Sequence, residues 1–164
     1  MRQLGLTLLE LLIALTVLAI LLSIGAPAMD ELIHQQRAKS YVQQFSRHLH
    51  FARLQASSHL QPVRLCPVSG NQCLGNWQQD PIWLTLQLPE PTPPQLLREL
   101  PALPGGHRLS YNRQQLEFRR DGSLNALENG TFYYCPPSRF NWHYRLVLNQ
   151  AGRSRLHYIN TACP

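Results

Sequence analysis

The sequence predicts an α+β fold in which one long N-terminal helix packs on a head of antiparallel strands. Two observations predict this fold. An apolar run near the N-terminus continues into a stripe of apolar residues with helical period, and short strand-like segments separated by turn signals follow it. The length of 164 residues, of which 44% are hydrophobic, suits one folded head and leaves no room for a large two-domain enzyme.

The first half of the predicted helix is long and apolar enough to cross a membrane. Fifteen of the nineteen residues from Leu6 to Ile24 are apolar, and Glu10 is the only charged one among them. At 1.5 Å per residue this run spans about 28 Å, which is close to the thickness of the hydrocarbon core of a bilayer. We therefore expect residues 6–28 to span the membrane or to pack inside a fibre.

The second half of the helix, residues 29–60, is predicted to be amphipathic. After Pro27, apolar residues recur every three or four positions, and polar or basic side chains fill the positions between them. This period predicts a nearly continuous helix from about Leu6 to Ser58, whose second half backs a sheet. The stripe consists of Ala38, Tyr41, Val42, Phe45, Leu49, Ala52 and Ala56.

Residues 61–164 are predicted to form a β-rich head with a basic C-terminal tail. Gln61-Pro62 ends the helix, and Asp121-Gly122 and Asn129-Gly130 are turn signals. The six prolines from Pro89 to Pro104 predict a surface loop. The expected strands are Val63–Cys66, Ile82–Leu88, His107–Tyr111, Gln115–Phe118, Thr131–Cys135, Tyr144–Leu148 and Arg153–Ile159.

A charge inside the apolar run distinguishes this run from a cleavable secretory signal. Placing the carboxylate of Glu10 in lipid costs about 2.5–3.5 kcal/mol, and a disposable signal has no reason to carry that cost. The segment Gly5-Leu6-Thr7-Leu8-Leu9-Glu10-Leu11 resembles the class III signal of type IV pilins and pseudopilins. The resemblance implies a type IV pilin-like fold with a long N-terminal helix.

The same resemblance implies a processing route and a location. Residues 1–5 would be a leader, which prepilin peptidase removes between Gly5 and Leu6 before the new N-terminus is methylated. Glu10, then the fifth residue, would pair with the N-terminal ammonium of a neighbouring subunit, because each charge alone is costly in lipid. The implied location is the bacterial inner membrane, crossed once with the head in the periplasm, and the extracellular pilus after assembly. The implied partners are other major and minor pilins.

Motifs in the head resemble the FimT/GspH family of minor pilins. That family has an Ala-Arg pair late in the helix and a first strand that ends in Leu-Cys, and Ala52-Arg53 and Leu65-Cys66 match these two features. Asn76-Trp77 and the turn at Asp121-Gly122 fit the same pattern. The resemblance spans most of the chain.

Because the head is expected to be exported, its four cysteines are expected to form disulfides. Three pairings are possible, and the sequence does not decide among them. Proximity along the chain favours Cys66–Cys73 and Cys135–Cys163.

The positive charge of the chain is concentrated in its C-terminal part. Residues 101–164 contain eight basic and three acidic residues, a net charge of +5, whereas residues 6–100 contain six of each. The segment Gly152-Arg153-Ser154-Arg155 resembles the G-R-x-R motif of FimT-type minor pilins, which bind DNA during natural transformation. A basic surface of this kind suits a polyanionic partner.

The geometry of an extended strand explains why the G-R-x-R motif suits phosphate binding. Alternate residues of an extended chain point to the same side, about 6.6–6.8 Å apart, so Arg153, Arg155 and His157 would project together and clamp phosphates. Gly152 would allow a turn or a close approach of the backbone, and Leu156 would face the core together with Tyr158. The candidate DNA-binding residues are Gly152, Arg153, Arg155, Arg145, His157, Arg119, Arg120 and Arg139.

The sequence leaves two classes of function open. One is a minor type IV pilin that binds double-stranded DNA without sequence specificity for uptake in natural transformation. The alternative is a GspH-like minor pseudopilin of type II secretion, or a minor pilin that primes assembly, without DNA binding. No carboxylate pair, catalytic triad, phosphate-binding loop or metal-ligand spacing is present in the sequence, so we expect no enzymatic activity, no cofactor and no metal.

Overall fold

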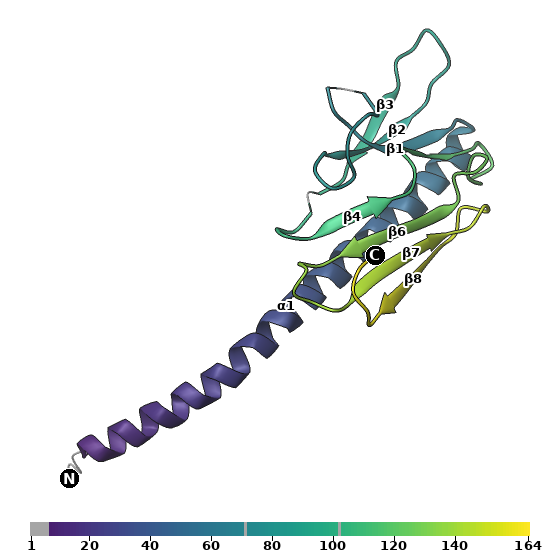
Figure 1. Ribbon diagram of the computed structural model, residues 1–164. Coiled ribbons are helices and arrows are strands. Elements are labelled where there is room, and N and C mark those ends of the chain that lie inside the picture. Colours follow the sequence, from purple (N-terminus) through teal and green to yellow (C-terminus); the bar gives the residue numbers. More distant parts are fainter. Residues whose placement is uncertain (1–6, 71, 102) are drawn as a thin grey trace. The chain divides into compact units, whose positions relative to one another are not determined.

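The computed structural model describes residues 7–70, 72–101 and 103–164, so the predicted cleavage pair Gly5 and Leu6 lies outside the described residues. The described chain divides into two compact units, one that ends at Gln36 and one that begins at Arg37. A single helix, α1 (Leu8–His59), contributes to both units, and the eight strands of the described residues all belong to the second (Figure 1).

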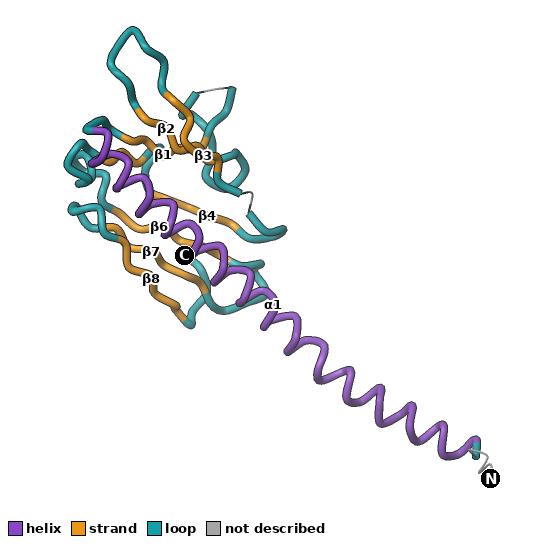
Figure 2. Tube along the Cα trace, turned by 180° about the vertical axis from the view of Figure 1, so that it is seen from behind, coloured by secondary structure: helices purple, strands orange, loops and turns teal. Residues whose placement is uncertain are grey.

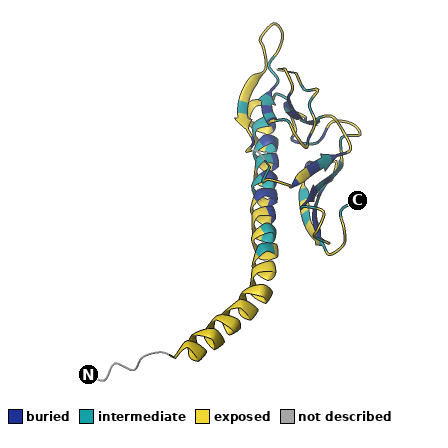
Figure 3. Ribbon diagram, turned by 60° about the vertical axis from the view of Figure 1, so that its left-hand side comes forward, coloured by how far each residue is buried: buried dark blue, intermediate teal, exposed yellow. Residues whose placement is uncertain are grey.

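In the first unit, α1 begins directly after Thr7. The hydroxyl oxygen of Thr7 accepts a hydrogen bond from the backbone N–H of Glu10 at 3.3 Å, so Thr7 caps the helix and the acidic residue lies in its first turn. The helix continues through Pro27, and its leucine and isoleucine side chains in this unit are exposed (Figure 3). By length and composition α1 is able to cross a membrane.

In the second unit, α1 supplies one face of the core. The buried residues of the helix are the seven members of the predicted stripe, from Ala38 to Ala56. Seen from behind, this part of the helix passes in front of the strands (Figure 2). The amphipathic period of the sequence therefore correctly predicts which face of α1 carries the head.

The strands form two antiparallel sheets. The first sheet has the order β3 (Gln95–Glu99), β2 (Ile82–Leu86), β1 (Val63–Pro67) and β5 (Leu116–Phe118). The second has the order β4 (Arg108–Tyr111), β6 (Gly130–Cys135), β7 (His143–Leu148) and β8 (Ser154–Ile159). The chain passes between the sheets three times: it leaves the first sheet after β3, enters the second at β4, returns to the first at β5 and stays in the second from β6 onward.

The expected surface loop from Pro89 to Pro104 is wrong in part, because it contains β3. This strand pairs with β2 through Leu86↔Gln95 and Trp83↔Glu99, with a bulge between Leu84 and Thr85. It is an edge strand and is mostly exposed, so it lacks the apolar alternation by which buried strands are found. Prolines are tolerated beside an edge strand because one side of it needs no ladder hydrogen bonds. All seven strands that the sequence predicts are present, and their ends differ from the predicted ends by one or two residues.

The core lies where both sheets meet α1. Phe45 of the helix packs edge-on against Phe132 of β6 with ring centroids 4.9 Å apart, and Tyr41 stacks on Tyr134 at 5.3 Å. Every buried core hydrophobic among the described residues lies between Ala38 and Leu148. A head that begins near Asp30 therefore retains the complete core and is expected to fold on its own.

Two disulfides tie the head together. One joins Cys66 to Cys73 and the other joins Cys135 to Cys163, which are the two pairings that proximity favours. The second closes a separation of 28 residues, which corresponds to about 3–4 kcal/mol in the chain-entropy model. It fastens the C-terminal residues to the second sheet.

Buried tyrosines make the stability of the head sensitive to alkaline pH. Burial raises the pKa of Tyr41 to about 12, and burial together with the Glu128 carboxylate raises the pKa of Tyr111 to about 12. A tyrosine in the unfolded chain ionises near pH 10, so the unfolded state binds fewer protons than the folded state above that pH. The contribution of these tyrosines to the free energy of unfolding is therefore expected to be complete below about pH 10 and to be lost between about pH 10 and 12.

Thermal unfolding of the head at a series of pH values measures this loss. Tyr41→Phe is expected to make the alkaline decline shallower, because one of the buried tyrosines no longer titrates. Tyr158→Phe, which changes a 48% exposed tyrosine, is the matched control and is expected to leave the decline unchanged. The same decline in both variants would show that burial of Tyr41 does not set the pH dependence.

Candidate nucleic-acid interface

The G-R-x-R segment lies in the hairpin between β7 and β8. The ladder runs from His143↔Ile159 to Leu148↔Ser154, and residues 149–153 form the connection. Three hydrogen bonds close it: Asn149 N–H to the Arg153 carbonyl at 3.1 Å, Gly152 N–H to the Asn149 carbonyl at 2.9 Å, and Arg153 N–H to Asn149 Oδ1 at 2.9 Å. Strand β8 thus begins at Ser154, and Arg153 stands one residue earlier, at the end of the connection.

Gly152 allows the backbone of the hairpin to lie close to the turn at Gly122. Its φ of +72° is unfavourable for any residue with a side chain, and a Cβ at this position would lie 2.5 Å from the backbone oxygen of Gly122. The two turns are also joined by hydrogen bonds between Leu124 N–H and the Gln150 carbonyl at 2.9 Å and between Gln150 Nε2 and the Leu124 carbonyl at 2.6 Å. Since Gly152 is buried, its role at the candidate site is to place Arg153.

Strand β8 alternates between the two faces of its sheet. Ser154 faces α1, where its hydroxyl lies 3.0 Å from that of Ser46, and Leu156 packs partly against the core. Arg155 and His157 occupy the alternate positions and are exposed on the outer face. The expectation that Tyr158 faces the core is wrong in part: its ring contacts that of Tyr144 at 5.4 Å but remains 48% exposed, because β8 is the edge of the sheet.

Arg145 of β7 joins Arg155 and His157 on the outer face. It lies directly opposite His157, and Arg155 lies opposite Val147, so Arg145 and Arg155 are diagonal neighbours. Diagonal neighbours in an antiparallel pair are about 7–8 Å apart. The side chain of Arg145 is half-buried, and its Nε is shielded from solvent and has no hydrogen-bond partner among the described residues.

Arg119 and Arg120 form a second basic group beside the hairpin. Both are exposed in the turn that Gly122 N–H closes on the Arg119 carbonyl at 2.8 Å. The contact between Gly122 and Gly152 places this turn next to the one that precedes Arg153. Asp121 lies among these arginines, and hydrogen bonds from Ser123, together with the charge of Arg119, lower the pKa of its carboxyl group. The turn therefore carries less positive charge than its two arginines suggest.

Arg53 was not among the predicted site residues. A Cβ at Gly122 would lie 3.1 Å from Cγ of Arg53, so this side chain of α1 covers the turn from the helix side, while its neighbour Ala52 is fully buried. The Ala52-Arg53 pair of the sequence thus has a packing role, in which the alanine meets the core and the arginine covers the turn. Its position late in the helix was the signal that could have found it.

Arg139 is not brought to this group. It is exposed in the connection between β6 and β7, where its guanidinium lies 4.8 Å from the centroid of the Phe140 ring. That connection and residues 149–153 lie at opposite ends of β7, whose six residues span roughly 20 Å. Arg139 is therefore separated from Arg153 by the length of the sheet.

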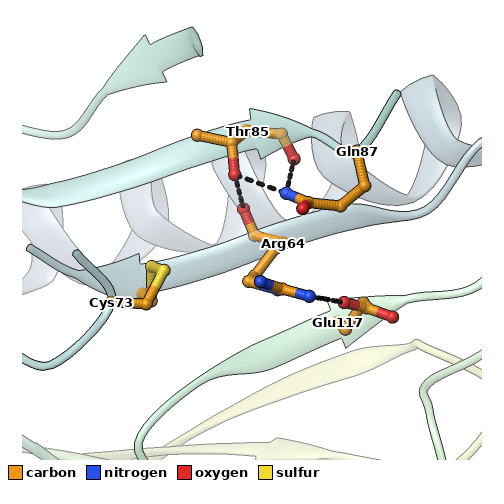
Figure 4. The surroundings of a disulfide bond; sticks show 6 residues. Arg64, Cys73, Thr85, Gln87 and Glu117 are labelled. Carbon is orange, nitrogen blue, oxygen red and sulfur yellow. Dashed lines mark hydrogen bonds and ion pairs between the residues drawn. A yellow bond between two sulfur atoms is a disulfide. The ribbon is translucent and has the colours of Figure 1, made fainter. Parts of the chain in front are cut away.

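The outer faces of the two sheets differ in charge. On the first sheet, Arg64 pairs with Glu117 at 2.9 Å (Figure 4). Glu99 lies on the same face of this sheet, opposite Trp83. The four strands of the second sheet contain no acidic residue. In the described part of the chain, ion pairs join Arg64 to Glu117 and His34 to Asp30, and neither pair involves an arginine of the second sheet.

Two family models match the chain. The model described as the type II transport protein GspH matches residues 41–152, and the prokaryotic N-terminal methylation motif matches residues 1–26. No curated protein matches it. The first model covers more than half of the chain and ends at Gly152, so Arg153 and Arg155 lie just beyond the matched region.

Solved structures share the fold. In one crystal form, the type IV minor pilin FimU of Pseudomonas aeruginosa is 18% identical, covers 75% of this chain and 90% of its own, and superposes with a TM-score of 0.61. A second crystal form of FimU is 19% identical, covers 73% of this chain and 91% of its own, and has a TM-score of 0.54. The helix packed on antiparallel sheets is therefore the fold of a type IV minor pilin.

Replacing Gly152 tests how the hairpin is held. Gly152→Ala forces an alanine into a left-handed conformation, at about 1–3 kcal/mol, and drives its Cβ against a backbone oxygen. The melting temperature of the head is expected to fall by several degrees. Gly105→Ala is the matched control, because a Cβ there meets nothing within 4 Å. Equal melting temperatures in the two variants would contradict the close contact with Gly122.

Proposed function

The chain belongs to the GspH family of pilin-like proteins, and from this premise we propose that it is a minor type IV pilin that binds double-stranded DNA for uptake in natural transformation. The observation that supports DNA binding is the outer face of the second sheet. Arg145, Arg155 and His157 share this face, Arg153 stands at its end, and no acidic residue of the four strands offsets them. Arg119 and Arg120 widen the basic surface beside the hairpin.

The proposed binding is electrostatic and independent of sequence. Guanidinium groups form charge-assisted hydrogen bonds with phosphate oxygens, and contacts to phosphates carry no direct sequence information. Each arginine that neutralises a phosphate releases counterions, so affinity falls steeply as salt is added. A single head is expected to bind weakly, and several heads on one fibre would raise the apparent affinity through avidity.

The N-terminal unit supports the assembly side of the proposal. Membership of a pilin family with an N-terminal methylation motif implies processing by prepilin peptidase and association with other pilins. The exposed apolar helix fits a membrane-anchored pilin. We place the protein in the inner membrane with its head in the periplasm, and on the cell exterior when it is assembled. Gly5 and Leu6 would form the cleavage site, and Glu10 would pair with the N-terminus of a neighbouring subunit.

A second candidate function is a structural part of a secretion or pilus apparatus. The matching family model carries the description of a type II transport protein, which favours a minor pseudopilin or an assembly-priming pilin. Such a protein needs the same N-terminal motif and the same fold, but it has no need of the arginines on the second sheet. DNA binding by the head therefore separates the two candidates. Both are structural proteins, as the family and the fold indicate.

A salt titration of the head with a labelled duplex tests the proposal. The wild-type head is expected to bind duplexes of unrelated sequence equally, with log K falling linearly as log salt rises. The double variant Arg153→Gln/Arg155→Gln is expected to bind at least about tenfold more weakly, with a slope shallower by about 1.8 because two phosphate contacts are lost.

Arg47→Gln is the matched control for this titration. Arg47 is an exposed arginine on the side of α1 away from the core stripe, so its loss removes one of the two positive charges that the double variant loses and does not touch the sheet. Binding by the double variant that equals binding by the control would reject Arg153 and Arg155 as the site. If the wild-type head does not bind duplex at low salt, the result would reject DNA binding and favour the second candidate function, a structural part of a secretion or pilus apparatus.

A further inference from the structure

We infer that the DNA-binding surface is a diagonal stripe that crosses the whole outer face of the second sheet, from Arg155 on β8 to Arg108 on β4, with Tyr133 near its middle. This inference rests on the proposed function. It adds two residues to the binding surface, Arg108 and Tyr133, which no sequence motif indicates. We refer to Arg155, Arg145, Tyr133 and Arg108 as the arginine stripe.

The strand register places the members of the arginine stripe on one face. Tyr133 lies opposite Arg145 on one side and opposite Ser110 on the other, and Arg145 lies opposite His157. These four residues form one row across the sheet. The row lies on the side away from α1, because the neighbours of Ser110, Tyr133 and Arg145 along their strands are buried in the core, and Leu156, beside His157, packs partly against it. Arg108 is two residues from Ser110 along β4 and shares that face.

The stripe runs diagonally, because its two ends are displaced from this row in opposite directions along their strands. Arg155 lies one two-residue step from the row toward the hairpin, whereas Arg108 lies one such step toward the other end of the sheet. With strands about 4.8 Å apart and a step of about 6.8 Å, the backbone positions of Arg155 and Arg108 are about 20 Å apart. That length corresponds to roughly six base pairs at 3.4 Å per nucleotide of one strand.

Exposure and charge support a role in binding. Arg108 and Arg155 are exposed, and Arg145 and Tyr133 are half-buried between them. None of the three arginines is in an ion pair within the described residues. The half-buried phenol of Tyr133 gives the stripe a hydroxyl that is able to donate to a phosphate or sugar oxygen between the cations.

The C-terminal residues cover part of this face beside Arg108. The disulfide between Cys135 and Cys163 and a hydrogen bond from His143 Nδ1 to the Thr161 carbonyl at 2.9 Å hold residues 160–164 against the sheet. Cys135 and His143 are accordingly only 4% and 5% exposed. Figures 1 and 3 place this end of the chain on the side of the second sheet away from α1. The tail thus covers Cys135, which lies directly opposite Arg108, while Arg108 and Arg155 at the two ends of the stripe remain exposed.

The test is a comparison of single variants in the head with the same labelled duplex. Arg108→Gln is expected to make the salt slope shallower by about 0.9, which corresponds to about eightfold weaker binding at 0.1 M salt, because one phosphate contact is lost. Arg108→Lys keeps a cation at the same place and is expected to retain most of the affinity and the wild-type slope. Arg47→Gln controls for loss of net charge, and the melting temperature of each variant checks that the head remains folded.

The outcomes separate the stripe from the proposed function. If Arg108→Gln behaves like Arg47→Gln while the Arg153/Arg155 double variant loses binding, the stripe is wrong and the proposed DNA-binding function stands. If the wild-type head does not bind duplex at low salt, the proposed function fails and the stripe fails with it. A shallower slope for Arg108→Gln, with recovery in Arg108→Lys, supports the stripe.

Discussion

The packing of the second sheet against α1 determines where every candidate cation lies. Leu109, Phe132 and Leu146 occupy alternate positions on adjacent strands and are buried between the sheet and the helix. The pleat then forces the residues between them, Arg145 among them, onto the opposite face. A slip of one residue would bury these charges and expose the core, so the apolar pattern fixes the register and the basic face together. Binding and stability therefore depend on the same alternation.

The hairpin and the C-terminal disulfide shape the two ends of this face. At one end, the absence of a side chain at Gly152 lets the hairpin dock against the turn at Gly122, which Arg53 covers from α1. At the other end, the bond between Cys135 and Cys163 holds the last residues against the sheet. Within the described residues, none of Arg108, Arg145 and Arg155 on this face is held in an ion pair. Their charges remain available to a ligand.

Much of the fold follows from the sequence, because local periods carry the signal. The helical stripe and seven strands are predicted by periods that each segment contains in itself. Strand β3 is missed because an exposed edge strand between prolines has no such period. At the site, alternation along one strand relates Arg155 to His157, but pairing between distant strands brings Arg108 to the same face. The contact of Gly152 with Gly122 likewise joins turns about thirty residues apart, so local patterns in the sequence do not predict it.

The most direct test is an NMR titration of the isotopically labelled head with a short duplex of mixed sequence. If the outer face of the second sheet binds DNA, the largest changes in amide chemical shift will fall on residues 108–110, 131–135, 143–147 and 153–157. The exposed side of α1 and the outer face of β1 and β2, where Arg64 is paired with Glu117, will be unchanged. Shifts centred on the first sheet, or no shifts at low salt, would contradict the assignment of DNA binding to this face.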